Sequence, residues 1–208
     1  CPVNSARPVN GAYSPLNDAH YFGQKVFDLY REWLGVNPLR QQLVMRVHYG
    51  YQYGNAFWDG RQMTFGDGNA YMYPLATWDV IAHEVSHGFT EQNSGLEYRG
   101  MSGGINESFS DVSAAALGQY VHGSFNWKMG EHVMKQAEAM RYFIQPSRDG
   151  ASIDHASRYY PGMDVHHSSG VFNKAFYHLA TTQGWDIRKA FTAYATANRL
   201  YWGPTTDF

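Results

Sequence analysis

The pentapeptide His-Glu-Val-Ser-His at residues 83–87 constrains the fold of this chain more than any other feature. It lies in a segment typical of a helix, because Thr77 is a suitable N-cap and Gly95 offers a left-handed stop. Side chains four apart share one face of a helix, so the two imidazoles point to one spot with Glu84 beside them. This spacing predicts half of a zinc site with a carboxylate base attached.

A second predicted helix supplies the third protein ligand that a catalytic zinc site needs. Glu107 follows His87 by 20 residues (107 − 87), enough for one helix to end and another to run alongside it. Asp111, one turn later on the same face, and Asn106 are placed to support the ligating histidines. A helical histidine pair can also be purely structural, but its combination with this carboxylate segment favours the metal site.

These residues resemble those of the thermolysin family of zinc metalloendopeptidases, closest to its pseudolysin (bacterial elastase) and vibriolysin-like branch. The similarity covers nearly the whole chain and includes matching segments at 55–58, 65–68, 104–111 and 164–170. It implies an α+β fold, a thermolysin-like zincin whose β-containing N-terminal lobe and helical C-terminal lobe flank a zinc cleft. The lobes are expected at residues 1–98 and 99–208.

The order of the predicted elements agrees with this division, because strands precede the central helix and helices follow it. A strand is predicted at 43–49, and a hairpin at 55–58 and 62–65 surrounds an Asp-Gly turn. Further helices are predicted at 17–34, 131–143, 169–182 and 186–201.

The charge content of the chain limits the kinds of partner that it can be expected to bind. Charged residues make up 16% of the chain, against about 25% in typical globular proteins, and the net charge is −2 without a basic cluster. Nucleic acid and anionic membrane surfaces are therefore not expected partners. No apolar run approaches the roughly 18 residues of a membrane span.

The ends of the sequence suggest a portion of a longer domain. Cys1 is the single cysteine, which indicates a missing partner or a free thiol. The resemblance implies a disulfide from Cys1 to a cysteine further upstream, and a catalytic domain that continues beyond Phe208. We expect a chain truncated at both ends, lacking a β-rich part and the last helices; the alternative is a compact member that begins at Cys1.

The predicted chemistry needs no covalent intermediate. Zinc would activate water, and Glu84 would take the water proton and pass it to the leaving nitrogen. Cys1, the single cysteine, is terminal and offers no nucleophile system that competes with this mechanism. The resemblance implies that Tyr98 and His166 donate hydrogen bonds to the oxyanion and that Asp164 orients His166.

The resemblance also implies how substrate is held. The hairpin strand is expected to form one edge of the cleft, where backbone groups near Asn55 and Ala56 pair with an extended peptide. Arg141 matches an arginine that binds the carbonyl just past the cut. An apolar pocket for a bulky hydrophobic residue matches Leu75, Val80, Met129, Val133 and Met140, although each of these could equally be a core residue.

One departure from the family pattern concerns calcium. Asp79 and Glu131 match the first and last carboxylates of a calcium site, but the positions between them carry Ala115, Gly118, Asn126 and Lys128. Calcium prefers several carboxylates and is repelled by an ammonium group. We predict that this site is lost and that Lys128 pairs with a nearby acid.

Together these inferences predict a zinc-dependent neutral endopeptidase that cuts before bulky hydrophobic residues. The resemblance implies a bacterial protein exported through the periplasm, secreted as a zymogen, acting as a monomer and inhibited by its own pro-peptide. Two alternatives stay open, a zinc-binding but catalytically silent fragment and a pseudo-protease that serves as a binding module.

Overall fold

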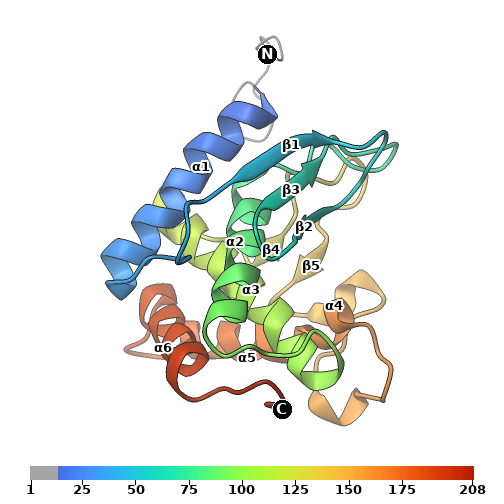
Figure 1. Cartoon of the computed structure of the whole chain (residues 1–208). Coiled ribbons are helices and arrows are strands. Elements are labelled where there is room, and N and C mark those ends of the chain that lie inside the picture. Colours follow the sequence, from blue (N-terminus) through green and yellow to red (C-terminus); the bar gives the residue numbers. More distant parts are fainter. Residues whose placement is uncertain (1–13) are drawn as a thin grey trace.

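The computed structural model describes residues 14–208, so Cys1 and its expected disulfide lie outside the described part. Two helices, α2 (Trp78–Gln92) and α3 (Gly100–His122), cross the centre of the molecule (Figure 1). Strands lie on one side of this pair, and most of the later helices lie on the other. The predicted order holds for the main sheet, whose strands precede α2, but two short strands, Lys128–Met129 and Arg141–Tyr142, follow α3.

The first helix forms where its sequence predicts one. Helix α1 (Pro15–Leu29) begins at Ser14, whose hydroxyl accepts a hydrogen bond from the amide of Asn17 at 3.3 Å. It continues as a five-residue π-helix, η1 (Tyr30–Leu34), and ends at Gly35 with φ 70°, a left-handed conformation that suits glycine.

The main sheet has three strands, β1 (Met45–Tyr49), β2 (Ala56–Trp58) and β3 (Met63–Gly66). Their order is β1-β3-β2, with β1 parallel and β2 antiparallel to β3. The β2–β3 pair is the predicted hairpin. Because β2 is an edge strand, its outer backbone groups face away from the sheet, where an extended peptide could pair with them.

Helix α2 starts as its sequence indicates. The Thr77 hydroxyl accepts a hydrogen bond from the amide of Val80 at 3.4 Å. At the other end the amide of Gly95, with φ 63°, donates to the carbonyl of Thr90 at 2.9 Å, which supports the expected left-handed stop. Because α2 is central, almost its whole circumference is buried.

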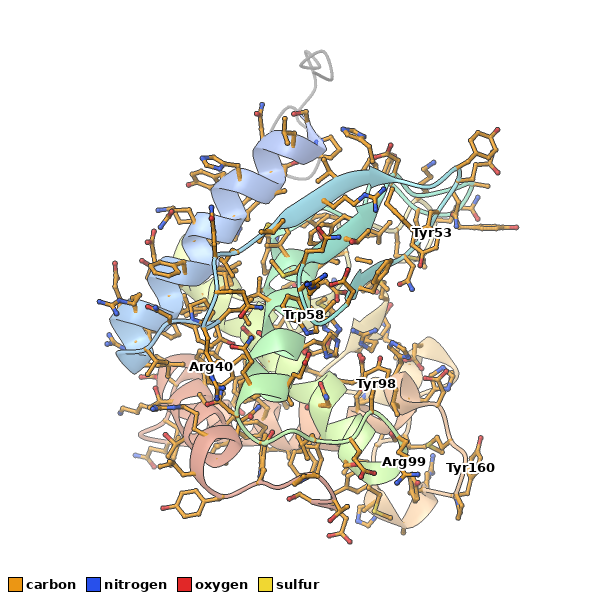
Figure 2. All side chains as sticks on the ribbon, in the orientation of Figure 1. Arg40, Tyr53, Trp58, Tyr98, Arg99 and Tyr160 are labelled. Carbon is orange, nitrogen blue, oxygen red and sulfur yellow. The ribbon has the colours of Figure 1, made fainter. Side chains whose placement is uncertain are left out.

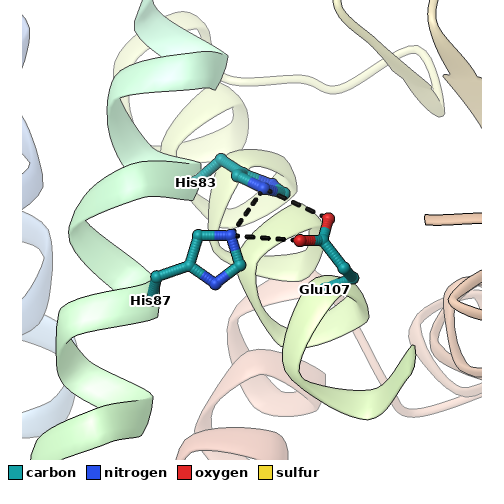
Figure 3. Close-up of side chains that lie close together, drawn as sticks. All are labelled: His83, His87 and Glu107. Atoms are coloured by element: carbon teal, nitrogen blue, oxygen red, sulfur yellow. Dashed lines mark hydrogen bonds and ion pairs between the residues drawn. The ribbon is translucent and has the colours of Figure 1, made fainter. Parts of the chain in front are cut away.

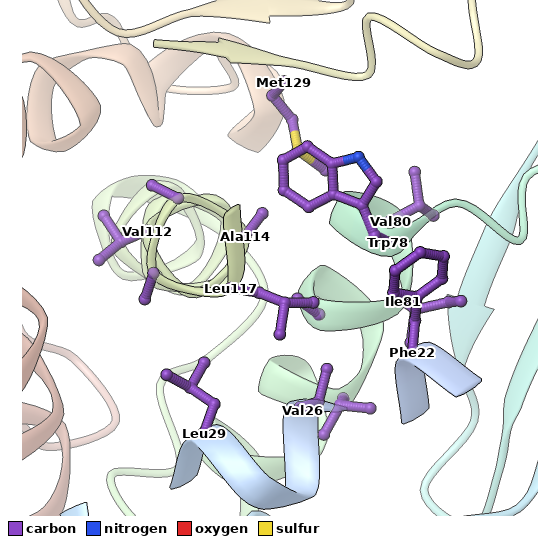
Figure 4. Close-up of a cluster of buried hydrophobic side chains, with 14 of the residues drawn as sticks. Phe22, Val26, Leu29, Trp78, Val80, Ile81, Val112, Ala114, Leu117 and Met129 are labelled. Atoms are coloured by element: carbon purple, nitrogen blue, oxygen red, sulfur yellow. The ribbon is translucent and has the colours of Figure 1, made fainter. Parts of the chain in front are cut away.

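The hydrophobic core joins α1 to the central helices. Figure 4 shows Phe22, Val26 and Leu29 of α1 facing Ile81 of α2 and Leu117 of α3. Between the two central helices, Phe109 of α3 stacks on Phe89 of α2 with centroids 5.6 Å apart. This packing fixes the two helices that carry the predicted zinc ligands.

The C-terminal half is built from short elements and two longer helices. After the two-stranded sheet β4 (Lys128–Met129) and β5 (Arg141–Tyr142) come two 3-10 helices, η2 (Pro146–Asp149) and η3 (Ala156–Arg158). The chain ends with α4 (Val165–Ser168), α5 (Gly170–Thr181) and α6 (Ile187–Leu200). No helix among residues 14–208 has the length and apolar character to cross a membrane.

The prediction of a helix at 131–143 is wrong. This stretch forms turns and ends in β5, and its backbone pairs with residues far away in the sequence. The amide of Tyr73 donates to the carbonyl of Val133 at 2.8 Å, and the amide of Lys135 donates to the carbonyl of Tyr71 at 3.0 Å. These tertiary hydrogen bonds outweigh the helical spacing of the apolar residues.

Candidate metal centre and cleft

The predicted ligands converge on one point between α2 and α3 (Figure 3). The Nε2 atoms of His83 and His87 lie 2.9 Å apart. The carboxylate of Glu107 faces both, with Oε2 at 3.4 Å from His83 Nε2 and Oε1 at 3.3 Å from His87 Nε2. One donor atom from each residue lies within 4.8 Å of the other two, so a single metal ion could contact all three.

Polar side chains behind the histidines set their orientation. The Nδ1 atom of His83 lies 2.9 Å from Asp111 Oδ1, and Nδ1 of His87 lies 2.8 Å from Asn106 Oδ1. The Asn106 amide nitrogen donates to the carbonyl of Leu96 at 3.1 Å, which turns the amide oxygen toward His87. Each Nδ1 therefore donates its proton, and each Nε2 presents a lone pair to the site.

This arrangement fits a cation. The two Nε2 atoms lie 2.9 Å apart, so a proton or a metal ion is needed between them, and Oε2 of Glu107 is buried without a hydrogen bond from the described residues. Burial opposes protonation of His83, but Glu107 and Asp111 outweigh burial and raise the pKa of His83 to about 10. The site thus attracts positive charge, and two imidazoles with one carboxylate are a ligand set that zinc favours.

The pKa values of two glutamates in the same site are shifted in opposite directions. Glu84 is only 5% exposed, and burial raises the pKa of its carboxyl above the usual value. Burial acts the same way on Glu107, but the charges of His83 and His87 outweigh it and hold the pKa of Glu107 well below its usual value. Glu107 is therefore suited to be an anionic ligand, whereas burial makes the Glu84 carboxylate a stronger proton acceptor than an exposed one.

Arg141 joins the layer behind the histidines. Its Nε and Nη2 atoms donate to Asp111 Oδ2 and Oδ1 at 2.7 and 2.6 Å. Burial opposes ionisation of Asp111, but this guanidinium outweighs burial and keeps the pKa of the Asp111 carboxyl below its usual range. One carboxylate thus ties the expected substrate-binding arginine to the ligand His83.

Tyr98 and His166 lie next to each other beside the ligand Glu107. The Tyr98 hydroxyl donates to Glu107 and lies 3.3 Å from His166 Nε2. Burial, followed by the Glu107 charge, raises the pKa of Tyr98, so the hydroxyl keeps its proton at neutral pH. Asp164 caps α4 by accepting from the amide of His166 at 2.9 Å and also lies 2.7 Å from its Nδ1.

The cluster opens into a cleft of about 550 Å³. Trp58 on the sheet side and Tyr98 on the helical side both line it, and Figure 2 shows where they lie. The predicted substrate residues that line the cleft are Asn55, Ala56, Leu75, Val80, Met129, Met140 and Arg141. Val133 is not among the lining residues, and its side chain is fully buried in the core.

The residues at the expected calcium positions form their own contacts. Lys128 Nζ lies 2.6 Å from Glu138 Oε1 and 3.7 Å from Glu131 Oε1, so the predicted pairing with a nearby acid is confirmed. Both Asp79 oxygens accept backbone hydrogen bonds, from Val80 at 2.9 Å and from Gly130 at 2.8 Å.

The sequence analysis missed a polar contact that supports the site. Asn173 of α5 donates through Nδ2 to Asp111 Oδ2 at 2.8 Å, and its Oδ1 accepts from the Ser108 hydroxyl at 2.8 Å. All three residues are buried. Asn173 follows Asp111 by 62 residues (173 − 111), and no local spacing signals a contact at that separation.

A helix pair carrying two histidines and a glutamate, with a buried second glutamate beside them in a cleft, is typical of zinc metallopeptidases. Comparison with known proteins narrows this class. The profile described as thermolysin metallopeptidase, catalytic domain, matches residues 4–91, and that of the alpha-helical domain matches residues 94–208. The chain belongs to the thermolysin metallopeptidase family, as its sequence predicted.

Curated relatives agree with this assignment. The chain is 62% identical over 205 residues to a hemagglutinin/proteinase of Vibrio cholerae and 59% identical over 205 residues to a neutral protease of Vibrio proteolyticus. Each match covers 99% of this chain and 34% of the relative, so the chain spans about a third of their length. A zinc metalloproteinase of Legionella pneumophila is 54% identical over 208 residues, covering 96% of this chain and 38% of the relative.

A solved structure confirms the predicted fold. The precursor of protealysin, a metalloproteinase from Serratia proteamaculans, superimposes with a TM-score of 0.86 at 28% identity. The similarity covers 93% of this chain and 68% of that one. The described part therefore has the thermolysin-like arrangement of a mixed N-terminal region and a helical C-terminal region.

Proposed function

We propose that this chain is the catalytic portion of a zinc-dependent neutral endopeptidase that cuts peptide bonds before bulky hydrophobic residues. The observation that carries the proposal is the buried Glu84 beside the convergent His83, His87 and Glu107, at the floor of a cleft with an apolar end.

Zn²⁺ held by those three residues would supply a Lewis acid that polarises the scissile carbonyl and makes water acidic. Glu84 accepts the proton of the attacking water on its carboxylate and delivers it to the leaving nitrogen. The upward shift of its pKa supports this role, because burial makes the carboxylate a stronger proton acceptor.

Tyr98 and His166 would donate hydrogen bonds to the oxyanion of the tetrahedral intermediate. Their polar atoms lie 3.3 Å apart, so both can donate to one oxygen that lies to the side of the pair, about 2.8 Å from each. For this the Tyr98 hydroxyl leaves Glu107 and turns toward the substrate. Asp164 would hold the His166 ring in place through Nδ1 and so present Nε2 to the oxyanion.

Substrate would bind as an additional strand on the free edge of β2, near Asn55 and Ala56. Pairing through main-chain atoms tolerates many sequences, so the apolar pocket lined by Leu75, Val80, Met129 and Met140 would provide the selectivity for the residue after the cut. Arg141 lines the same end, where it can bind the carbonyl just past the scissile bond.

The remaining expectations rest on the family and on its relatives. We infer that the protein is secreted, that it is made with an inhibitory pro-peptide and that it acts as a monomer. A matched structure described as a precursor supports the pro-peptide. The unfavourable calcium positions around Lys128 support zinc as the one metal of the described residues.

Cleavage of a quenched peptide tests the proposal. In buffered zinc, the chain should cleave a peptide with Leu or Phe after the expected bond and leave one with Asp there intact. Glu84→Gln should bind zinc at one ion per chain and lose about 10²–10⁴-fold in turnover, because only the proton acceptor is removed. Zinc binding without turnover by the native chain would instead support the silent fragment, and turnover that survives in Glu84→Gln would refute the assigned base.

A further inference from the structure

The end of the cleft opposite the apolar pocket carries an acidic side chain, Glu91. It lies on α2 one turn after His87 and two turns after His83, so all three project from one face of the helix. Four residues of helix advance about 6 Å, which places Glu91 about that far from the ligand histidine along the axis. Val80, at the apolar end, lies before His83 on the same helix.

Glu91 is held in place by Trp58 of the edge strand β2. The indole Nε1 donates to Glu91 Oε2, and both residues line the cleft. The indole in turn rests on α2 at Gly88, where an added Cβ would lie 3.1 and 3.2 Å from two atoms of the ring. A glycine is needed there for such close packing, so Trp58 is fixed over the helix and directs the carboxylate.

The second oxygen of Glu91 is free to bind a ligand. The side chain is exposed, and among residues 14–208 no Lys or Arg forms an ion pair with it. Its Oε1 accepts no hydrogen bond from that part of the chain and lies 3.8 Å from where a Cβ at Gly60 would stand. The cleft is therefore asymmetric, with methionines at one end and a carboxylate that lacks a basic partner at the other.

We propose that Glu91 is a specificity residue that binds the side chain of a Lys or Arg in the substrate, two or three residues before the scissile bond. The inference rests on the proposed function, which assigns the residue after the bond to the apolar pocket. Residues before the bond then extend past His87 toward Glu91. An extended peptide advances about 3.3 Å per residue, so the offset of about 6 Å corresponds to about two residues.

A matched peptide series tests this subsite. The peptides carry Phe after the scissile bond and Ala, Arg or Glu at the second or third position before it. We expect kcat/KM to be about threefold higher for Arg than for Ala at low ionic strength, the size of an exposed ion pair, and lower for Glu. The preference should shrink in about 1 M salt, where the Debye length is about 3 Å.

Two variants separate charge from position. Glu91→Gln keeps an oxygen that accepts from the Trp58 indole but loses the charge, so the Arg-to-Ala ratio should fall to about one. Glu32→Gln removes an equivalent charge outside the cleft and should retain the ratio. Glu91→Arg should reverse the preference in favour of Glu.

Binding affinities keep this test independent of turnover. Titration of the same peptides into zinc-loaded Glu84→Gln, with and without the additional substitution Glu91→Gln, measures the Arg-to-Ala ratio of Kd values even if no peptide is cleaved. If adding Glu91→Gln leaves that ratio unchanged, the subsite is refuted. Failure to cleave any peptide, with the Kd preference intact, would refute the proposed function and leave the subsite standing.

Discussion

At the scale of single residues, the site depends on carboxylates that serve more than one partner. Asp111 accepts hydrogen bonds from His83, from Arg141 and from Asn173, so it fixes a ligand and compensates a buried cation at once. Removing its charge should therefore weaken both the orientation of His83 and the compensation of the Arg141 charge. The residues that hold the ligands in place therefore matter to the metal site as well as the ligands themselves.

Asp111→Asn therefore has two expected effects. Zinc affinity should fall by about 10–100-fold, because the His83 ring loses its anionic partner. The free energy of unfolding should fall by about 3–5 kcal/mol, because the buried Arg141 guanidinium is left uncompensated. Competition with a chromogenic chelator measures the zinc affinity, and denaturant unfolding measures the free energy of unfolding. Asp207→Asn, at an exposed residue near the C-terminus, is the control, and an unchanged zinc affinity in Asp111→Asn would contradict the assignment.

At the scale of elements, close packing against α3 positions the helix that carries His166. A Cβ at Gly104 would lie 2.5 Å from the Ser168 hydroxyl and 3.2 Å from its Cβ, so α4 contacts the α3 backbone at this glycine. The position of His166 over the metal ligands thus depends on a residue that touches no substrate.

Gly104→Ala should displace α4 and with it His166. We expect a loss of about 1–3 kcal/mol in the free energy of unfolding from overpacking, and a larger fall in kcat than in zinc affinity. Gly203→Ala adds the same methyl group where nothing lies within 4 Å of the new Cβ and φ is ordinary, so it serves as the control. Equal activity of the two variants would show that α4 does not need this contact.

Elements that depend on local signals could be predicted from the sequence, and elements that depend on long-range contacts could not. The ligand helix was recognisable because four-residue spacing and its caps are local signals, and Glu107 because only a turn separates the two helices. The stretch 131–143 was misassigned because its backbone pairs with residues near Tyr71, far earlier in the chain. Asn173 was missed for the same reason, since its contact with Asp111 exists only once α5 packs on α3.

At the scale of the whole molecule, metal binding should contribute strongly to stability. The ligands come from both central helices, so an ion joins α2 to α3 and relieves the repulsion among buried acceptors. Ligand binding to the folded state adds about 4.1 kcal/mol at a free concentration about 1,000 times Kd. Tm should therefore fall on zinc removal with a chelator and return when zinc is restored, whereas an unchanged Tm would argue against a metal at this site.

Calcium should have no comparable effect. Lys128 places an ammonium group between Glu131 and Glu138, and the Asp79 carboxylate is already occupied by backbone amides, so the described residues of this region leave no set of free carboxylates for a second ion. With zinc buffered at a constant level, millimolar calcium and a calcium-selective chelator should give the same Tm and the same rate of autolysis. Lys128→Gln removes the competing charge and tests whether the ammonium alone excludes calcium. A calcium-dependent rise in Tm of the native chain, or calcium bound by Asp79 and Glu131 in a crystal grown with millimolar calcium, would show that the site has been retained.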